Sequence, residues 1–137
     1  MLSIIIPTLN AAKGLSATVA SIEDRGMTTE ILVVDGGSTD GTVELAKSLG
    51  ARVLTAPSGR GGQLSAGATA AKGGWLMFLH ADTILGPNWS KAATDFMASS
   101  KSANRTGYFN FRLDDGDPWA RRLERIVAWR SRALGLP

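Results

Sequence analysis

The chain has 137 residues, of which 44% are hydrophobic and 20% are charged, with a formal net charge of +3 at pH 7 and no cysteine. This composition is typical of a globular protein and excludes an intrinsically disordered chain, and the lack of cysteine excludes disulfides and cysteine metal sites. Its apolar runs reach about six residues, far short of the roughly 20 that cross a bilayer, so we expect a cytoplasmic protein without a membrane span.

Four apolar runs predict β-strands, at residues 3–6, 31–34, 52–55 and 75–79. Each run is almost continuously apolar, which is typical of strands that are covered on both faces of a parallel sheet. The segments between them are long enough for crossover helices, at residues 12–23, 42–49 and 63–71. Gly50 lies where a left-handed C-cap glycine belongs. The alternation predicts an α/β, Rossmann-like fold with a mostly parallel, doubly wound sheet.

The pattern changes after Asp82. Pro87 can open a helix with apolar residues at helical spacing, which are Trp89, Ala92, Ala93, Phe96 and Met97. Residues 98–106 are polar and read as a loop, whereas residues 108–113 alternate in polarity and predict a half-covered strand. A basic amphipathic helix is predicted at residues 119–134. We expect one domain over residues 1–137, with a core at 1–97 and the later strand and helix at 107–137.

Two predicted strands end in carboxylates. Asp35 closes the second strand, and the segment His80-Ala81-Asp82 follows the fourth. Open α/β sheets bind their ligands at the carboxyl ends of the strands. Carboxylate oxygens suit a divalent cation whose remaining ligands come from substrate phosphates. We therefore expect one crevice that holds both carboxylates, a phosphate-bearing ligand and a cation.

Three motifs carry a resemblance to a known family. They are Ser3-Ile4-Ile5-Ile6-Pro7-Thr8-Leu9-Asn10, Val33-Val34-Asp35-Gly36-Gly37-Ser38-Thr39-Asp40-Gly41-Thr42 and Leu79-His80-Ala81-Asp82. In this order and spacing, over about the first 85 residues, the chain resembles the N-terminal, donor-binding half of a glycosyltransferase of family 2. It is most similar to a bacterial branch that has His-Ala-Asp in place of Asp-x-Asp. The resemblance implies a GT-A type fold and inverting transfer of a sugar from a nucleotide diphosphate to an acceptor hydroxyl.

The resemblance also implies roles for individual residues. The expected nucleotide-sugar site contains Pro7, Thr8, Asn10, Asp35, Gly36, Ser38, Arg60, Gly61, His80 and Ala81. The expected ligand of Mg²⁺ or Mn²⁺ is Asp82. Purely structural alternatives remain for several of them. In these, Pro7 and Asn10 form an ordinary turn, Arg60 is solvated in a glycine loop, and His80 is packed at a strand end. Asp40 is interpreted as a structural helix cap.

The general base of the reaction is not identified. The resemblance implies that this acid lies beyond Pro137, so the chain is expected to be truncated at its C-terminus. Asp114, Asp115 and Asp117 precede a helix and are expected to form a turn. The alternative function is a fragment that binds nucleotide diphosphates without turnover. A Walker A loop and a dinucleotide fingerprint are both excluded by the spacing of the glycines.

Basic residues gather at the C-terminal end. Residues 1–100 carry 7 Lys and Arg against 8 Asp and Glu, and residues 101–137 carry 8 against 4. Because the arginines concentrate on one predicted helix, we expect no nucleic-acid partner. That helix has an apolar stripe (Trp119, Leu123, Ile126, Val127, Leu134), with Arg121, Arg122, Arg125 and Arg132 mainly elsewhere. The structural interpretation is a helix packed on the sheet. The two functional interpretations are contact with the inner face of a membrane, near a lipid-linked acceptor, and a homodimer.

Overall fold

The computed structural model of the chain describes residues 1–23, 26–102 and 104–134, the last three of these by their backbone alone. The chain forms two compact units, Met1–Ala98 and Ser99–Pro137. The first unit contains the sheet, and the second contains one long helix. That residues 1–137 fold as a single domain stays a prediction.

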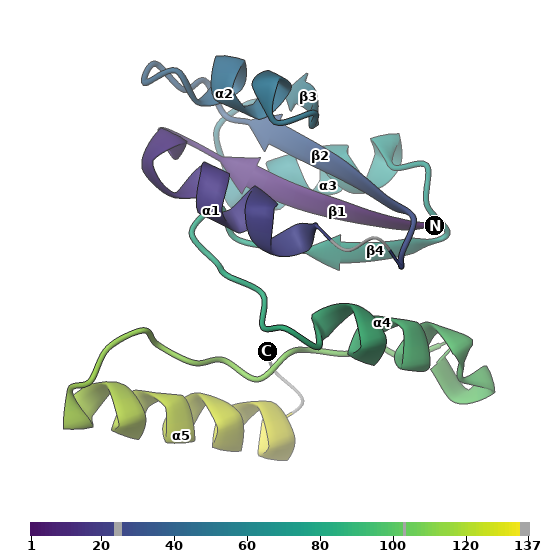
Figure 1. Cartoon of the computed structure of the whole chain (residues 1–137), viewed down its shortest axis with the longest axis vertical. Helices are drawn as coiled ribbons and strands as arrows, with labels where there is room; N and C mark the ends of the chain where they lie inside the picture. The colour runs from purple at the N-terminus through teal and green to yellow at the C-terminus, as the bar shows by residue number, and fades with distance from the viewer. Residues whose placement is uncertain (24–25, 103, 135–137) are drawn as a thin grey trace. The chain divides into compact units, whose positions relative to one another are not determined.

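The first unit is built on a parallel sheet. Its strands are β1 (Leu2–Thr8), β2 (Thr29–Asp35), β3 (Arg52–Thr55) and β4 (Trp75–Phe78). Their order across the sheet is β3-β2-β1-β4, and each neighbouring pair is parallel (Figure 1). At the centre, Ile5 of β1 pairs with Leu32 on one side and with Phe78 on the other. The predicted parallel sheet is confirmed, and the order of its strands reverses between β1 and β4.

Three helices connect the strands and cover both faces of the sheet. They are α1 (Ala12–Ile22), α2 (Thr42–Ser48) and α3 (Arg60–Ala70). Apolar residues of α1 and α2 share one buried cluster with Ile4 and Ile6 of β1, whereas residues of α3 pack with Ile5 on the opposite face. Figure 1 shows α1 and α3 on opposite sides of the sheet. Successive side chains of β1 therefore point into hydrophobic clusters on opposite faces of the sheet, and the predicted doubly wound arrangement is confirmed.

The ends of two helices bear on the later argument. Gly50, after α2, has a φ of 78°, which confirms the predicted left-handed glycine. Helix α3 starts at Arg60 and not at the predicted residue 63, since the N–H of Gln63 donates to the carbonyl oxygen of Gly59 and closes a first turn over the glycines. Gly61 and Gly62 are therefore helical, and the predicted glycine loop is shorter than the sequence suggested.

The edge strand β4 differs from the expectation of burial on both faces. Leu76 and Phe78 are 41% and 52% exposed. Phe78 lies beside Ile5 in register, on the face that α3 covers over β1 and β2. The expectation was wrong for this strand because the apolar run alone does not show how far a covering helix reaches across the sheet.

Helix α4 (Trp89–Ala98) completes the first unit. Trp89 is buried, and Ala93 and Met97 pack against the same cluster as α1. The rings of Trp75 and Phe96 meet edge to face, with centroids 5.8 Å apart. The helix predicted after Pro87 is confirmed, and its apolar spacing explains which side it buries.

In the second unit, the strand predicted at residues 108–113 is wrong. These residues have no regular secondary structure, and Phe109 and Phe111 are 45% and 49% exposed. A strand needs a partner strand, and the described part of this unit offers none. The preceding segment, predicted as a loop, contains a short 3₁₀ helix, η1 (Ser100–Ser102).

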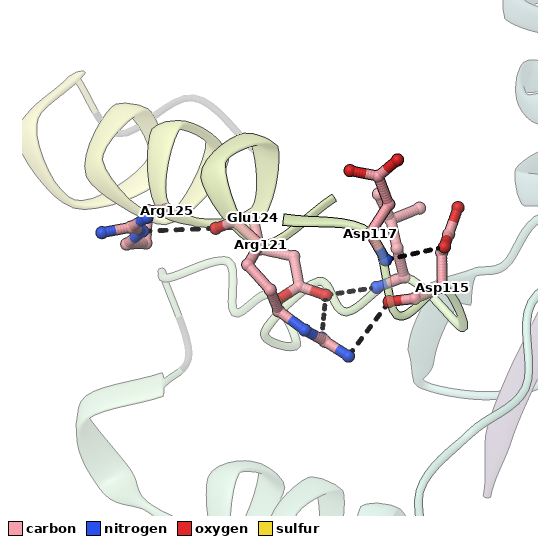
Figure 2. Close-up of polar contacts among 6 residues, drawn as sticks. Asp115, Asp117, Arg121, Glu124 and Arg125 are labelled. Atoms are coloured by element: carbon pink, nitrogen blue, oxygen red, sulfur yellow. Dashed lines mark hydrogen bonds and ion pairs between the residues drawn. The ribbon is translucent and has the colours of Figure 1, made fainter. Parts of the chain in front are cut away.

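Helix α5 (Pro118–Leu134) is the main element of the second unit. Asp117 accepts a hydrogen bond from the N–H of Trp119. Asp115 accepts one from the N–H of Asp117 (Figure 2). Glu124 accepts hydrogen bonds from the N–H of Leu113 and from the guanidinium of Arg121. The expected turn of aspartates is confirmed as the cap that starts α5. Among the described helices, none combines the length and the hydropathy that a membrane crossing requires.

Candidate functional site

A cleft of about 730 Å³ opens at the carboxyl ends of β1 and β4. Three segments line it: the turn after β1 with the start of α1, the turn that leads into α3, and the segment after β4. Strand order reverses between β1 and β4. In open α/β sheets this reversal point is where ligands bind, because the two connections leave in opposite directions and part from each other there.

Most of the expected site residues meet in this cleft. Those that line it are Pro7, Thr8, Asn10, Arg60, His80, Ala81 and Asp82. Four expected residues are not among the lining residues, namely Asp35, Gly36, Ser38 and Gly61. The fold therefore brings together residues as far apart in sequence as Pro7 and Asp82, but it does not bring the two strand-end carboxylates into one crevice.

Asp35 lies under the cleft and not in it. It is only 2% exposed, and each carboxylate oxygen accepts two hydrogen bonds. Oδ1 accepts from the hydroxyls of Thr8 and Ser38, and Oδ2 accepts from the N–H groups of Gly37 and Ser38, at 2.9 and 2.8 Å. A ligand has to replace one of these donors to reach the carboxylate. The shared crevice expected for Asp35 and Asp82 is thus corrected, since a buried carboxylate is satisfied locally.

These hydrogen bonds also set the charge state of Asp35. Burial by itself raises the pKa of this carboxyl. The hydrogen bonds from Ser38, Gly37 and Thr8 outweigh burial and hold the pKa below its ordinary value. Asp35 is therefore a carboxylate at neutral pH, and it fixes the loop after β2 against the end of β1.

Asn10 and Asp40 join the turn after β1 to the loop after β2. Asn10 has a φ of 51°, a left-handed conformation that asparagine tolerates better than most residues. Its side-chain oxygen accepts from the N–H of Thr39 at 2.9 Å, and its own N–H donates to Ser38. Asp40 accepts from the N–H groups of Ala12 and Thr42, so its role is structural, but the N-cap of α2 is Gly41 and not Asp40. The turn interpretation of Asn10 and its place in the cleft are therefore compatible.

Gln63 is a cleft residue that the sequence analysis did not identify. Its side chain is 4% exposed, and its Nε2 donates to the carbonyl oxygens of Thr8 at 2.8 Å and Val34 at 2.7 Å. Its Oε1 accepts from the N–H of Gly59 at 3.4 Å. One amide thus joins the ends of β1 and β2 to the turn before α3. No periodicity or motif in the sequence predicts this role, because a glutamine near the start of a helix is common and its hydrogen-bond partners lie on other elements.

The segment after β4 is held by α1. The hydroxyl of Thr18 donates to the carbonyl oxygen of Ala81 at 2.8 Å. A Cβ on Gly14 would lie 3.0 Å from the same oxygen and 3.3 Å from Cα of Asp82, so this glycine permits the close approach of α1. His80 and Asp82 are exposed and both line the cleft. They lie in the turn that follows β4 and not on the strand itself.

Positive charge enters the cleft from two helices. Arg60 is the first residue of α3, and Lys13 is the second residue of α1; both are exposed and line the cleft. The first N–H groups of α3 are free of intrahelical partners by the geometry of a helix start, so they add favourable sites for an anion. Lys13 was missed by the sequence analysis because its position depends on where α1 begins.

The donor set for a cation is small. Among the described residues there is no group of three or more His, Cys, Asp or Glu side chains that could hold a metal ion by themselves. Asp82 is the carboxylate that lines the cleft, with the imidazole of His80 near it in sequence. One carboxylate in an open cleft fits a cation that takes most of its ligands from phosphates and water. It does not fit a cation that is enclosed by protein ligands.

Comparisons with known proteins give a family. Residues 3–134 match the family model described as Glycosyl transferase family 2. A PGL/p-HBAD biosynthesis glycosyltransferase of Mycobacterium bovis is 41% identical over 93 residues, which cover 62% of this chain and 36% of that protein. Glycosyltransferase AglJ of Haloferax volcanii is 44% identical over 59 residues, covering 42% of this chain and 19% of that protein. The match thus covers little more than a third of the first relative and about a fifth of the second.

Solved structures give the same fold. Glucosyl-3-phosphoglycerate synthase from Mycobacterium tuberculosis, solved with Mn²⁺, uridine diphosphate and glucosyl-3-phosphoglycerate, has a TM-score of 0.54 and 29% identity, and the match covers 59% of this chain and 33% of that one. Staphylococcus aureus TarS 1–349, solved with UDP, has a TM-score of 0.62 at 24% identity and shows likeness of fold alone, over 70% of this chain and 31% of that one. The GT-A type fold that the resemblance implied is confirmed.

Proposed function

The chain belongs to glycosyltransferase family 2, and from this premise we propose that its β1/β4 cleft binds a nucleotide-diphosphate sugar for inverting transfer of the sugar to an acceptor hydroxyl. The observation that carries the proposal is the convergence of Asn10, Arg60 and Asp82 on one cleft at the reversal point of the sheet. A pyrophosphate needs positive charge and backbone donors, and the start of α3 with Arg60 offers both.

The proposed roles follow the placement of each residue. Pro7, Thr8, Asn10 and Ala81 line the cleft and take the nucleoside. Arg60 pairs with the diphosphate, which Lys13 can also reach from the start of α1. Asp35 contributes if a ribose hydroxyl or a base N–H replaces the Ser38 hydroxyl at its Oδ1. Gly36, Ser38 and Gly61 act by shaping the adjacent backbone.

Asp82 is the proposed ligand for Mg²⁺ or Mn²⁺, with His80 as a second candidate donor. When bound, the cation neutralises charge on the departing nucleotide diphosphate. An imidazole beside the carboxylate favours Mn²⁺ over Mg²⁺, since nitrogen donors suit the softer ion. The structure of Mycobacterium tuberculosis glucosyl-3-phosphoglycerate synthase, solved with Mn²⁺ and UDP, supports a cation at this class of site.

A base for the acceptor hydroxyl is not proposed among the described residues. Asp82 is assigned to the cation, and Asp115 and Asp117 are engaged at the start of α5. The chain spans 36% of the mycobacterial relative, so we propose that the base lies in sequence beyond residue 137. The alternative function is binding of nucleotide diphosphates without turnover. We also propose a lipid-linked acceptor, reached from the membrane surface by peripheral contact, with a homodimer as the alternative use of α5.

The test is a calorimetric titration of the chain with UDP and with GDP, in Mn²⁺ and in EDTA, followed by a donor turnover assay. Binding that depends on Mn²⁺, together with release of nucleotide diphosphate from the sugar donor, supports the transferase. Metal-dependent binding without release supports the binding fragment. If neither nucleotide binds in the presence of Mn²⁺, the proposed site is wrong.

A further inference from the structure

Helix α5 presents its large apolar residues to solvent. Trp119, Leu123, Ile126 and Trp129 are 71%, 48%, 55% and 64% exposed. Their spacing of three and four residues places them on one face of the helix. We call these four residues, together with Arg122, Arg125 and Arg130, the outer face of α5. This much apolar area on a single helix is typical of a surface that meets a partner.

Arginines lie within this face and not apart from it. Arg122 and Arg125 are exposed and, with Ile126 and Trp129, line a shallow hollow of about 300 Å³. The guanidinium carbon of Arg122 lies 5.2 Å from the ring centroid of Trp119, within the range of a cation–π contact. Arg130, also exposed, follows Ile126 at a spacing of four. Of the arginines expected mainly away from the apolar stripe, Arg122 and Arg125 border apolar residues, whereas Arg121 is paired with Glu124 on the other side of the helix.

The opposite side of α5 carries small residues and an ion pair. Ala120 and Ser131 are buried at 7% and 5% exposure. Glu124 is the sole carboxylate in the sequence of α5, and it is held on this side by the N–H of Leu113 and the guanidinium of Arg121. These hydrogen bonds lower the pKa of Glu124, the one from Leu113 most strongly. The outer face thus combines apolar side chains with positive charge, and the acid of the helix faces away from it.

We propose that the outer face of α5 binds an anionic membrane surface. Tryptophan is suited to the boundary between headgroups and acyl chains, and leucine and isoleucine can enter the apolar layer. The long stems of arginine lie along apolar surface while their guanidinium groups reach lipid phosphates. An electrostatic attraction to anionic headgroups then adds to apolar burial. The arrangement supports the proposed lipid-linked acceptor, and the inference rests on the proposed function only for that link.

Other occupants fit this face less well. A second copy would set the arginines of one outer face against those of the other, with no carboxylate between them to compensate. A protein core would bury charged guanidinium groups at high cost. Nucleic acid would leave Leu123 and Ile126 exposed, since aliphatic side chains neither stack on bases nor contact phosphates. An anionic bilayer satisfies both the apolar and the charged residues.

The test is co-sedimentation of the 137-residue chain with vesicles, without nucleotide, so that its result does not depend on the cleft. Vesicles of phosphatidylcholine alone are compared with an equal mixture of phosphatidylcholine and phosphatidylglycerol. We expect binding to the mixed vesicles that weakens at high salt, with a blue shift of tryptophan fluorescence as Trp119 and Trp129 leave water.

Two variants and one control sharpen the result. The double change R122Q and R125Q should weaken binding to the mixed vesicles by roughly tenfold to thirtyfold, because each basic residue near an anionic surface adds about a factor of five. The double change W119A and W129A should weaken it as well. The control, K47Q and K101Q, removes the same charge from exposed positions outside α5 and should change binding little.

Several outcomes would overturn the inference. They are absence of binding to the mixed vesicles, equal binding to neutral vesicles, and equal loss in the control variant. A wild-type dimer in sedimentation velocity that the tryptophan changes dissolve would assign the face to a second copy instead. Circular dichroism of each variant checks that α5 is still formed. Nucleotide titration of the same samples separates failure here from failure of the proposed cleft.

Discussion

The hydroxyl of Thr18 donates a 2.8 Å hydrogen bond to the carbonyl oxygen of Ala81, across 63 residues of sequence. This bond fixes the backbone immediately before Asp82 to the first helix. The position of the proposed cation ligand therefore depends on α1 and not on β4 alone.

Replacing Thr18 by valine tests this link. Thr18 is fully buried, and valine keeps its shape but removes the donor, so the carbonyl of Ala81 loses its partner. We expect a loss of about 1–3 kcal/mol in the free energy of unfolding and weaker Mn²⁺-dependent nucleotide binding. Urea denaturation and calorimetry measure the two effects. The control T69V, at an exposed helical position, should leave nucleotide binding unchanged; if both variants bind alike, the Thr18 link has no role in the site.

Replacing Asp82 by asparagine tests the cation assignment. Loss of a ligand should exceed the roughly 10- to 100-fold in metal affinity that loss of an outer-shell partner costs. We expect binding of UDP or GDP in Mn²⁺ to fall to the level measured in EDTA, while the free energy of unfolding stays close to that of the wild type because Asp82 is exposed. The matched change D95N removes an exposed carboxylate on α4. Retained Mn²⁺ dependence in D82N would assign the cation elsewhere.

Replacing Gln63 by methionine tests the junction of the strand ends. The variant keeps the length of the side chain but removes the Nε2 donor to the carbonyl oxygens of Thr8 and Val34. The oxygen of Thr8 keeps the N–H of Gly36 as a donor, so each lost hydrogen bond should cost about 0.5–1.5 kcal/mol. We expect lower stability and weaker nucleotide binding, since the turn before α3 loses its tie to β1. Q63E should be worse than Q63M, because a carboxylate would face two carbonyl oxygens. Equal effects of the two changes would argue against the hydrogen bonds.

Stability against acid should depend on Asp35. Its folded pKa is lowered below the ordinary value of 3.8, so the carboxylate stabilises the fold fully above that value. This contribution is lost as the pH falls from about 5 through the folded pKa. D35N should be less stable than the wild type at neutral pH, and the difference should shrink toward pH 3. Urea unfolding at a series of pH values measures it. A constant difference at every pH would mean that the loss is not one of charge.

Two glycines of α3 should respond in opposite ways to alanine. A Cβ on Gly67 would lie 2.4 Å from Cγ2 of Ile5 and 3.0 Å from Cγ2 of Val34, whereas a Cβ on Gly62 would meet nothing within 4 Å. We expect G67A to lower the free energy of unfolding by about 1–3 kcal/mol through overpacking. G62A should raise it by roughly 0.5–1 kcal/mol, because alanine favours a helix. Thermal melts of both variants decide the matter, and similar changes in both would contradict the close packing of α3.

Much of the fold could be predicted from the chain. Each of the four strands and three crossover helices of the sheet was expected within a few residues of its observed bounds, because apolar runs and their separations are local features. The strand expected at residues 108–113 failed for the converse reason. Alternating polarity indicates one covered face, but a strand forms only where another strand pairs with it.

The candidate site was predicted less evenly. Asp82, His80, Arg60 and Asn10 were expected and do line the cleft. Gln63 and Lys13 were missed, because their roles arise from where α3 and α1 begin against the sheet. Asp35 was expected in the crevice, since a strand-end carboxylate has no visible partner in sequence. Its partners come from Thr8, which is 27 residues earlier, and from the turn that follows it.

The sequence by itself determined the family, the parallel α/β architecture and the strand ends that carry the chemistry, because these depend on local apolar patterns and on motif spacing. Tertiary structure decided which of those strand ends share a cleft, which carboxylate is buried beneath it, and that Arg122 of α5 lies over the exposed ring of Trp119. The physical reason is that burial and hydrogen bonding are settled between residues far apart in the chain, and no local pattern records such a partner.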